Sequence, residues 1–519
     1  MLPLRPYTPL RMVLCLCGKC FEENPDREID YQTDILQGSL VLMDGKVYLR
    51  RYCQRGHGEV VSLYEQDYEL WNYLQQWRVP TKQLIPDTPG NYQPIPMNYL
   101  NGLGDLQTQH SCILLLDLTE ACNLNCPTCF AESGTGINRY ARVEDVLRTL
   151  DAAIEREGGR IDVLMLSGGE PTLHPQLFEI IQAAAARKVT RVLLNTNGIR
   201  IAREDRFLAE LAKLRHCTEV YLQFDGFSKE AHLYHRGEDL REVKRAAVER
   251  LSGARIFSTL VMAVSAGVND GETGAVVRYA FDTDYIGGVS FQPVFGSGRA
   301  QALNPLQRVT PTGLMRNLGE QTGGLVGPQD FIGLPCSHPD CTSLTYFIKG
   351  DQGQYNSVPR LLGHERLKAN LGLVSNTVGA FPGANAALRT ALTGMMSETT
   401  TISRPELVSY VWNLCTNCEL GLGEFAKQVA SVVLLRQNAE EIILRRIKRL
   451  HIKNFMDAWS MNIERLQQCC VHVGTLDAAA NPLRIPFCAR QAFGALRART
   501  FAGMLPVAEL RPARGKGAR

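Results

Sequence analysis

From Ile113 to Pro293, short apolar runs alternate with amphipathic segments whose apolar residues recur every three or four positions. The runs predict six strands, at Ile113 to Leu118, Val163 to Leu166, Val189 to Asn195, Glu219 to Phe224, Phe257 to Val264 and Gly288 to Pro293. The segments between them predict helices around Val143 to Glu157, Gln176 to Arg187, Glu204 to Leu214, Leu240 to Leu251 and Gly274 to Phe281. Because strands separated by helices form βαβ units, we predict an α/β fold with a parallel sheet curved into a partial (βα)6 barrel. Active-site groups are expected on loops at the carboxyl ends of the strands.

The predicted barrel domain occupies residues 108–300 and is flanked by two regions with different patterns. Residues 1–85 are predicted to form a small cysteine-containing module, with a hairpin at Ser39 to Arg51 that turns at Asp44-Gly45. Residues 301–519 form a C-terminal region that begins irregular and Gly-rich and then becomes helical in pattern.

The C-terminal region contains a long predicted helix from Glu424 to about Asp457. Its apolar stripe and the basic residues beside it are Ile443, Ile447 and Leu450, and Arg445, Arg446, Lys448 and Arg449. This pattern is typical of a packed helix with a solvated basic face. The alternative is a surface that contacts anionic lipid and holds the protein at the periphery of a membrane.

Composition narrows the class of protein. Of the 519 residues, 45% are apolar and 21% charged, which excludes a disordered chain and an integral membrane protein. The net charge of +3 equals the excess of basic residues in the tail from Glu509 to Arg519, so the body has no broad basic field and we expect no nucleic-acid partner. The first ten residues lack a secretory pattern, and we predict a cytoplasmic protein.

Cysteine is the unusual residue, with 16 copies. Disulfides are disfavoured in the cytoplasm, so clustered cysteines indicate metal binding. Only Cys112 and Cys217 stand alone, in apolar surroundings, and we interpret both as small core residues.

The first predicted strand leads into a C-x3-C-x2-C loop formed by Cys122, Cys126 and Cys129. Three thiolates on one loop can hold three irons of a [4Fe-4S] cluster and leave the fourth iron open to a small molecule. A zinc site is the alternative, but cysteine-rich zinc loops usually come as paired C-x2-C.

This loop and its position resemble the radical S-adenosylmethionine (SAM) superfamily. The resemblance extends to Gly168-Gly169-Glu170 after the second strand, which it implies contact the amino group of SAM. Asn197, Asp225 and Arg236, at or beyond the ends of later strands, are candidates for ribose or carboxylate contact, although Asn, Asp and Gly are also ordinary turn residues. The resemblance implies a 5'-deoxyadenosyl radical that abstracts hydrogen from an unactivated carbon, and an electron donor such as ferredoxin or flavodoxin.

A second metal site is predicted near the N-terminus. Cys17, Cys20, Cys53 and His57 have a spacing suited to tetrahedral zinc or a mononuclear, rubredoxin-like iron. His57 is the least secure ligand, because it could be an exposed loop histidine, and Cys15 could take its place.

The C-terminal region supplies seven further thiols, namely Cys336, Cys341, Cys415, Cys418, Cys469, Cys470 and Cys488. Two complete auxiliary [4Fe-4S] clusters would use eight. Either one auxiliary cluster is held by three cysteines, or a residue other than cysteine completes it; a structural zinc site is the alternative.

The C-terminal motifs from Leu334 to Cys341 and from Phe455 to Trp459, ahead of Cys469-Cys470, resemble the archaeal tetraether lipid synthase group, whose members have also been described as pterin methyltransferases. The resemblance implies carbon-carbon coupling of lipid chain ends, with a substrate radical held on an auxiliary cluster, and it requires an elongated apolar tunnel. Radical methylation of a pterin is the alternative and requires a compact polar pocket with ring-stacking side chains. The non-enzymatic alternative is an electron-transfer protein whose fold is stabilised by bound metal.

Overall fold

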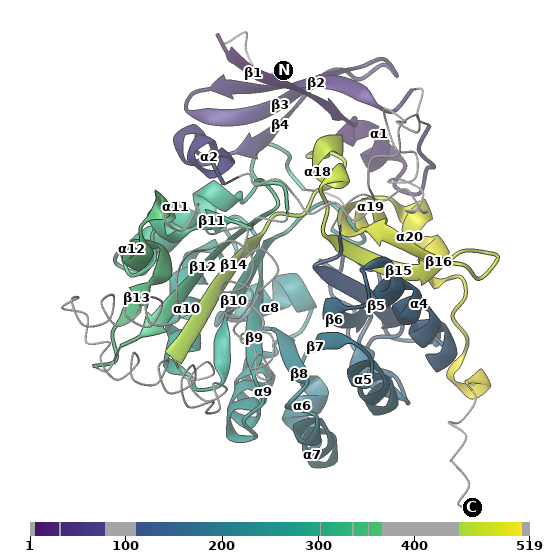
Figure 1. Ribbon diagram of the computed structural model, residues 1–519. Coiled ribbons are helices and arrows are strands. Elements are labelled where there is room, and N and C mark those ends of the chain that lie inside the picture. The colour runs from purple at the N-terminus through teal and green to yellow at the C-terminus, as the bar shows by residue number, and fades with distance from the viewer. Residues whose placement is uncertain are drawn as a thin grey trace, which may run out of the picture.

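The computed structural model describes residues 6–30, 33–77, 110–300, 303–334, 337–350, 352–365 and 446–510. These residues form two sheets, a small antiparallel one near the N-terminus and a large mainly parallel one (Figure 1). Within this described part, no helix combines the length and the apolar character needed to cross a membrane.

The N-terminal module is a four-stranded antiparallel sheet with two helices. Its elements are β1 (Thr8–Cys15), α1 (Gly18–Glu23), β2 (Leu36–Met43), β3 (Lys46–Cys53), β4 (Gly58–Glu65) and α2 (Tyr68–Gln75). The predicted hairpin is confirmed, because β2 and β3 pair around a turn in which Asp44 and Gly45 both have positive φ. The module packs against the C-terminal segment and shares an apolar core with it, which includes Trp71, Trp459 and Phe493.

All six predicted strands of the barrel are confirmed and lie side by side in chain order. They are β5 (Ile113–Thr119), β6 (Ile161–Gly168), β7 (Val189–Thr196), β8 (Thr218–Gln223), β9 (Ser258–Val264) and β10 (Ile286–Pro293), and each neighbouring pair is parallel.

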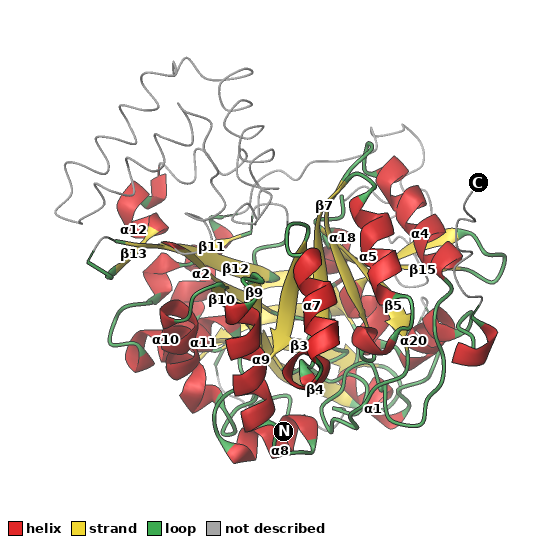
Figure 2. Cartoon of the chain, turned by 90° about the horizontal axis from the view of Figure 1, so that it is seen from below, coloured by secondary structure: helices red, strands yellow, loops and turns green. Residues whose placement is uncertain are grey.

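The connecting helices lie along the outside of this sheet (Figure 2). They are α4 (Val143–Arg156), α5 (Leu177–Ala185), α6 (Ile199–Arg203), α7 (Asp205–Lys213), α8 (Lys229–Arg236), α9 (Arg241–Gly253) and α10 (Thr273–Asp282), and α11 (Pro311–Gln321) follows β10. Their apolar faces and the outer face of the sheet form the main core. The inner face is left to line the barrel.

Strands from the C-terminal segment extend both edges of the barrel. β14 (Ile447–Lys453) is parallel to β10, and β15 (Val471–Leu476) is parallel to β5. Beyond them lie antiparallel strands, β11 (Ile332–Gly333), β12 (Thr342–Lys349) and β13 (Tyr355–Ser357) on one side and β16 (Pro482–Pro486) on the other. The sheet stays open, as predicted for a partial barrel. The remaining helices are α12 (Val358–Leu362), α18 (Ile463–Gln467), α19 (Phe487–Ala492) and α20 (Gly494–Phe501).

The predicted helix from Glu424 to Asp457 is wrong over its described part, because Ile447–Lys453 is a strand. The apolar and basic residues alternate across the sheet instead of around a helix. Leu450 faces the main core, and Lys448 is buried on the same side, where its ammonium group donates hydrogen bonds to three backbone carbonyls between the end of α10 and the start of β10.

Arg449 on the other side is buried and pairs with Glu219 of β8. The two central basic residues are therefore not solvated, and they offer no surface to anionic lipid. Residues 424–445, with Ile443 and Arg445, lie outside the described residues.

Candidate active site and metal centres

The three-cysteine loop follows β5, and a loop from the other side of the barrel holds it. The Arg299 side chain donates hydrogen bonds to the carbonyls of Cys126 (2.7 Å) and Ser133 (2.8 Å), and its backbone N–H donates to Cys129 (3.0 Å). Gly298, with φ of 55°, lies so close to this loop that a Cβ would be 2.2 Å from the carbonyl oxygen of Cys129. The segment after β10 therefore fixes the backbone that carries the thiols.

Cys122, Cys126 and Cys129 line one cavity at the carboxyl ends of the parallel strands, together with Gly168, Gly169, Glu170, Asn197 and Arg236. Burial raises the pKa of Cys122 to about 12 and also raises the pKa of Cys129. Thiols in such a site release their protons when they bind a metal. Three thiols that line one cavity can bind three irons of a [4Fe-4S] cluster, which leaves the fourth iron for another ligand.

The two glycines of Gly168-Gly169-Glu170 are explained by close backbone packing. A Cβ on Gly168 or on Gly169 would lie 2.2 Å from the carbonyl oxygen of Thr119 or of Ala121, respectively. The N–H groups of Gly169 and Glu170 donate to these same carbonyls, at 2.7 and 2.9 Å. Only glycine lets the end of β6 approach the start of the cysteine loop this closely.

The carboxylate of Glu170 is buried and fixed in place. It accepts hydrogen bonds from the hydroxyl groups of Thr172 (2.6 Å) and Thr196 (2.7 Å) and from the backbone N–H of Asn197 (2.8 Å). A negative charge is thus held at the cavity wall beside Cys122, where it can accept a hydrogen bond from a bound ammonium group.

Arg236 lines the cavity, whereas Asp225 lies behind it. The guanidinium forms a bidentate pair with the Asp225 carboxylate, at 2.6 and 2.8 Å, and the aspartate is completely buried. Although burial opposes it, the Arg236 charge holds the pKa of Asp225 well below its usual range. Asp225 therefore has no open path to a ligand and instead orients Arg236.

Lys244 of α9 is a buried cation near this cavity that the sequence pattern did not reveal. Its ammonium group donates a 2.6 Å hydrogen bond to the carbonyl oxygen of Asn197. Burial, and then the charge of Arg236, lower its pKa to about 8. Its position on an ordinary amphipathic helix gives no sequence signal, because only the packing of α9 against α6, which begins just after Asn197, brings it to the site.

A second, inner cavity lies deeper in the barrel and shares four residues with the first, Phe130, Asn195, Gln223 and Gln292. One wall is a row of amide and hydroxyl groups, in which Gln223 donates to Asn195 (2.8 Å) and Gln292 donates to the Tyr221 hydroxyl (3.1 Å). Three phenylalanine rings, those of Phe130, Phe455 and Phe487, line another part of it, together with aliphatic side chains. Lys453, at the end of β14, also lines this cavity, with its ammonium group 5.2 Å from the centre of the Tyr221 ring.

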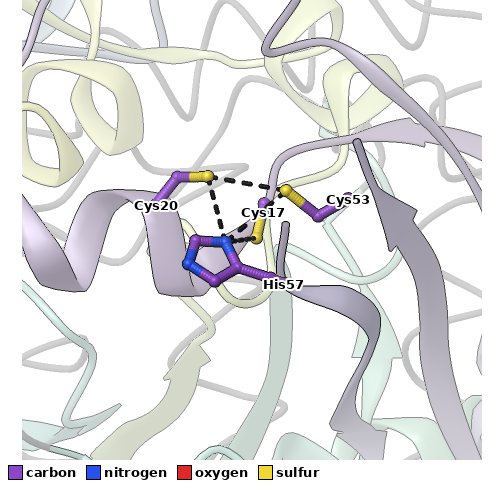
Figure 3. A group of neighbouring side chains, drawn as sticks. All are labelled: Cys17, Cys20, Cys53 and His57. Atoms are coloured by element: carbon purple, nitrogen blue, oxygen red, sulfur yellow. Dashed lines mark hydrogen bonds between the residues drawn. The ribbon is translucent and has the colours of Figure 1, made fainter. Parts of the chain in front are cut away.

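The N-terminal residues predicted as metal ligands come together in the structure (Figure 3). The Sγ atoms of the three cysteines and Nδ1 of His57 all lie within 4.8 Å of one another. His57 Nδ1 is 3.5, 3.4 and 3.5 Å from the Sγ atoms of Cys17, Cys20 and Cys53, and the Sγ atoms of Cys20 and Cys53 are 3.6 Å apart. Metal-ligand distances of about 2.3 Å to sulfur and 2.0 Å to nitrogen in a tetrahedron place such atoms about 3.5–3.8 Å apart.

The geometry favours His57 over Cys15 as the fourth ligand. His57 Nε2 lies 2.9 Å from the Glu23 carboxylate, a contact that turns Nδ1 toward the thiols. The Sγ atom of Cys15 instead donates to the carbonyl oxygen of Leu36 at 3.6 Å, and burial raises its pKa to about 11. The four residues Cys17, Cys20, Cys53 and His57 can therefore hold a tetrahedral zinc or iron.

Four of the seven C-terminal cysteines are described and gather near the edge of the barrel. Burial raises the pKa of Cys341, Cys469 and Cys488, and these thiols are close enough for their charges, and that of Cys470, to raise it further. Arg465 donates a hydrogen bond to the Sγ atom of Cys341 at 3.4 Å. Cys336, Cys415 and Cys418 lie outside the described residues.

The segment from Phe455 to Trp459 joins these sites. Phe455 lines the inner cavity, and the next backbone N–H, of Met456, donates to the Sγ atom of Cys488 at 3.3 Å. Asp457 pairs with Arg308 at 2.6 Å and accepts a hydrogen bond from the N–H of Gly296. Trp459 then packs on the N-terminal module, so one short segment spans the barrel, a C-terminal thiol and the module.

Known proteins are similar to this chain both in the barrel and over most of its length. Residues 116–280 match the family model described as the radical SAM superfamily. A 7,8-dihydro-6-hydroxymethylpterin dimethyltransferase of Methanocaldococcus jannaschii is 26% identical over 503 residues, which cover 92% of each chain. A mycofactocin maturase of Mycobacterium ulcerans is 30% identical over 159 residues, 31% of this chain and 41% of the maturase.

The match to a solved structure of a radical SAM methyltransferase from Sphaerobacter thermophilus covers 62% of this chain and 75% of that chain, with a TM-score of 0.32 and 12% identity. The family match runs from within β5 to within α10 and ends before β10, and the cysteine loop and Gly168-Gly169-Glu170 both fall inside it. Residues 116–280 are a radical SAM domain, which implies a [4Fe-4S] cluster that binds SAM, and this chain is a radical SAM enzyme.

Proposed function

We propose that this enzyme forms carbon-carbon bonds at unactivated carbons, and that its substrates are the apolar ends of lipid chains. The observation that carries the proposal is the inner cavity, which shares residues with the three-cysteine site and is lined by three phenylalanine rings. Phe455 and Phe487 are each adjacent in sequence to a residue at the C-terminal thiols, Met456 and Cys488 respectively. A chain end in this cavity would lie between the two sets of cysteines.

The roles of individual residues follow from the cavity at the strand ends. Cys122, Cys126 and Cys129 would hold the cluster, which with SAM supplies a 5'-deoxyadenosyl radical that abstracts hydrogen. Glu170 would accept a hydrogen bond from the amino group of SAM, while Asn197 and Arg236 would contact its ribose or carboxylate. Asp225 is a positioning residue, because it reaches the cavity only through Arg236.

The phenylalanine rings would exclude water and hold a hydrocarbon chain by burial of apolar surface. The C-terminal thiols would hold one or two auxiliary [4Fe-4S] clusters on the same side of the barrel. In lipid coupling, such a cluster would supply sulfur atoms that can stabilise a substrate radical, and these thiols would hold it near the chain end. An electron donor such as ferredoxin or flavodoxin is required.

Methyl transfer to a pterin is the second candidate, and two observations favour it. The row of amides formed by Asn195, Gln223 and Gln292 can donate and accept hydrogen bonds to a heterocycle that stacks on the phenylalanine rings. The relative that covers 92% of this chain is named as a pterin dimethyltransferase.

One experiment separates the two candidates. The reconstituted, reduced enzyme is incubated without oxygen with SAM and either archaeal-type diether lipids or a dihydropterin, and products are analysed by mass spectrometry. Lipid coupling gives a product with two chain ends joined and hydrogen lost, whereas methyl transfer adds the mass of a methyl group to the pterin. Coupled lipid without methylated pterin supports our proposal, and the reverse result overturns it.

Variants test whether the three-cysteine loop and the C-terminal cysteines have different roles in the reaction. Cys126→Ala should abolish 5'-deoxyadenosine formation, because one iron loses its ligand. Cys488→Ala should still form 5'-deoxyadenosine but give no coupled product, and Cys217→Ala, a cysteine far from both sets in sequence, should retain both activities. Full cleavage of SAM by the Cys126 variant would show that the assignment of the cysteine loop is wrong.

A further inference from the structure

Cys112, which the sequence pattern presents as an isolated core residue, lies next to a C-terminal thiol in the structure. Its backbone N–H donates a 2.8 Å hydrogen bond to the carbonyl oxygen of Cys470. The residues that follow each cysteine, Ile113 and Val471, are paired in the parallel strands β5 and β15. Cys112 and Cys470 thus extend this register and form a buried cluster of their own.

The surroundings of Cys112 are those of a metal ligand more than of a core residue. His110 Nε2 lies 3.0 Å from its Sγ atom, and both residues are buried. Hydrogen bonds to sulfur help to set the reduction potential of iron-sulfur sites, and a histidine N–H can donate one. Leu334, from the segment that leads to Cys341, packs against the same pair of cysteines.

Cys217, the other isolated cysteine, provides a contrast. Its Sγ atom donates to the backbone carbonyl of Leu214 at 3.3 Å, and the residue packs against the main apolar core. Its other hydrogen-bond partner in the described part of the chain is the Thr218 hydroxyl, at 3.7 Å, and not another thiol. Cys217 therefore behaves as the small core residue that the sequence predicted.

We infer that Cys112 is a ligand of the auxiliary iron-sulfur site, and that it binds beside Cys470. The inference concerns the metal content of the protein, so it holds for any substrate. It also supplies the missing ligand, because the C-terminal region has seven cysteines whereas two four-cysteine [4Fe-4S] clusters need eight. Cys112 is the eighth thiol, supplied by the residue just before β5 in the N-terminal half of the chain.

The test measures iron in a full-length parent protein that carries Cys122→Ala, Cys126→Ala and Cys129→Ala, so that only the auxiliary and N-terminal centres contribute. Cys112→Ala, Cys112→Ser and the control Cys217→Ala are each added to this parent. After anaerobic reconstitution and gel filtration, iron and acid-labile sulfide per chain are determined, and the proteins are examined by electron paramagnetic resonance both as isolated, oxidised samples and after reduction.

We expect Cys112→Ala to lose about four irons and four sulfides, or to show the signal of a three-iron cluster, while Cys217→Ala matches the parent. Cys112→Ser, which retains an oxygen ligand, should keep its iron with a shifted spectrum. Iron, sulfide and spectrum equal to those of the parent in Cys112→Ala would overturn the inference. If that variant does not fold, Cys112→Ser decides: an unchanged spectrum overturns the inference and a shifted one supports it.

A disulfide between Cys112 and Cys470 in peptides of the anaerobically purified holoenzyme would also overturn it. None of these measurements depends on product formation. A failure of the proposed lipid coupling and a failure of this ligand assignment are therefore distinguishable.

Discussion

At the scale of single residues, the candidate active site depends on contacts that leave little room for change. Two glycines and a glutamate at the end of β6 serve two purposes at once, because the glycines pack against the cysteine loop while Glu170 faces the cavity. The motif was recognisable from the sequence by its place after the second strand. The close packing that requires its glycines was not.

Gly169→Ala tests this packing. A Cβ would lie 2.2 Å from the carbonyl oxygen of Ala121, and a backbone atom cannot move aside as a flexible side chain would. We expect a loss of about 1–3 kcal/mol of stability and loss of the three-cysteine cluster, seen as about four fewer irons per chain. Gly253→Ala is the matched control, since its Cβ would meet no atom within 4 Å. An iron content equal to that of the control would contradict the prediction.

At the scale of elements, β14 shows how tertiary contacts decide between strand and helix. Its sequence mixes basic and apolar residues in a pattern that fits an amphipathic helix. In the fold, Lys448 donates to three carbonyls between the end of α10 and the start of β10, and Arg449 pairs with Glu219 on β8. These partners come from distant parts of the chain, so the helical interpretation could not be corrected from the local pattern alone.

Lys448→Met should destabilise the protein by about 2–5 kcal/mol, because it keeps the side-chain bulk but leaves buried carbonyl oxygens without their donor. Unfolding in urea, followed by circular dichroism, measures the change. Lys46→Ala, at an exposed lysine that begins strand β3, is the control and should stay within about 0.5 kcal/mol of the parent. Equal midpoints for the two variants would argue against this role of Lys448.

At the scale of the whole molecule, the N-terminal module is joined to the barrel through buried polar contacts. Glu65 at the end of β4 accepts hydrogen bonds from the hydroxyl and the backbone N–H of Thr312 at the start of α11, at 2.7 and 3.2 Å. Asp340 accepts hydrogen bonds from Tyr64 and Trp71 of the module. The metal-binding module is thereby held against the catalytic domain.

This interface should make stability depend on pH through Glu65. Burial raises its pKa to about 7 in the folded protein, above the ordinary value of 4.5 that we expect when the chain is unfolded. Between these values the folded state binds the extra proton, so the contribution of Glu65 is fully present below about pH 4.5 and is lost as the pH rises through 7.

The parent should therefore lose stability relative to Glu65→Gln as the pH rises from 5.5 to 7.5. The difference between their free energies of unfolding should change in favour of the variant by an amount of the order of 1–3 kcal/mol. Comparison of the two proteins at each pH cancels the effect of acid on the metal sites. Glu59→Gln, at an exposed carboxyl group on the same strand, should follow the parent at every pH. A constant difference between Glu65→Gln and the parent would show that Glu65 does not titrate in this range.

Sequence patterns alone were enough to predict the barrel strands, the three-cysteine loop, the motif after the second strand and the four residues that come together in the N-terminal module. Each of these is encoded locally, by hydrophobic period or by the spacing of chemically distinctive residues. Only the tertiary structure placed Asp225 behind Arg236, brought Lys244 to the cavity, made a strand of Ile447–Lys453 and set Cys112 beside Cys470. Those features depend on contacts between residues far apart in the chain, and local sequence patterns do not predict such contacts.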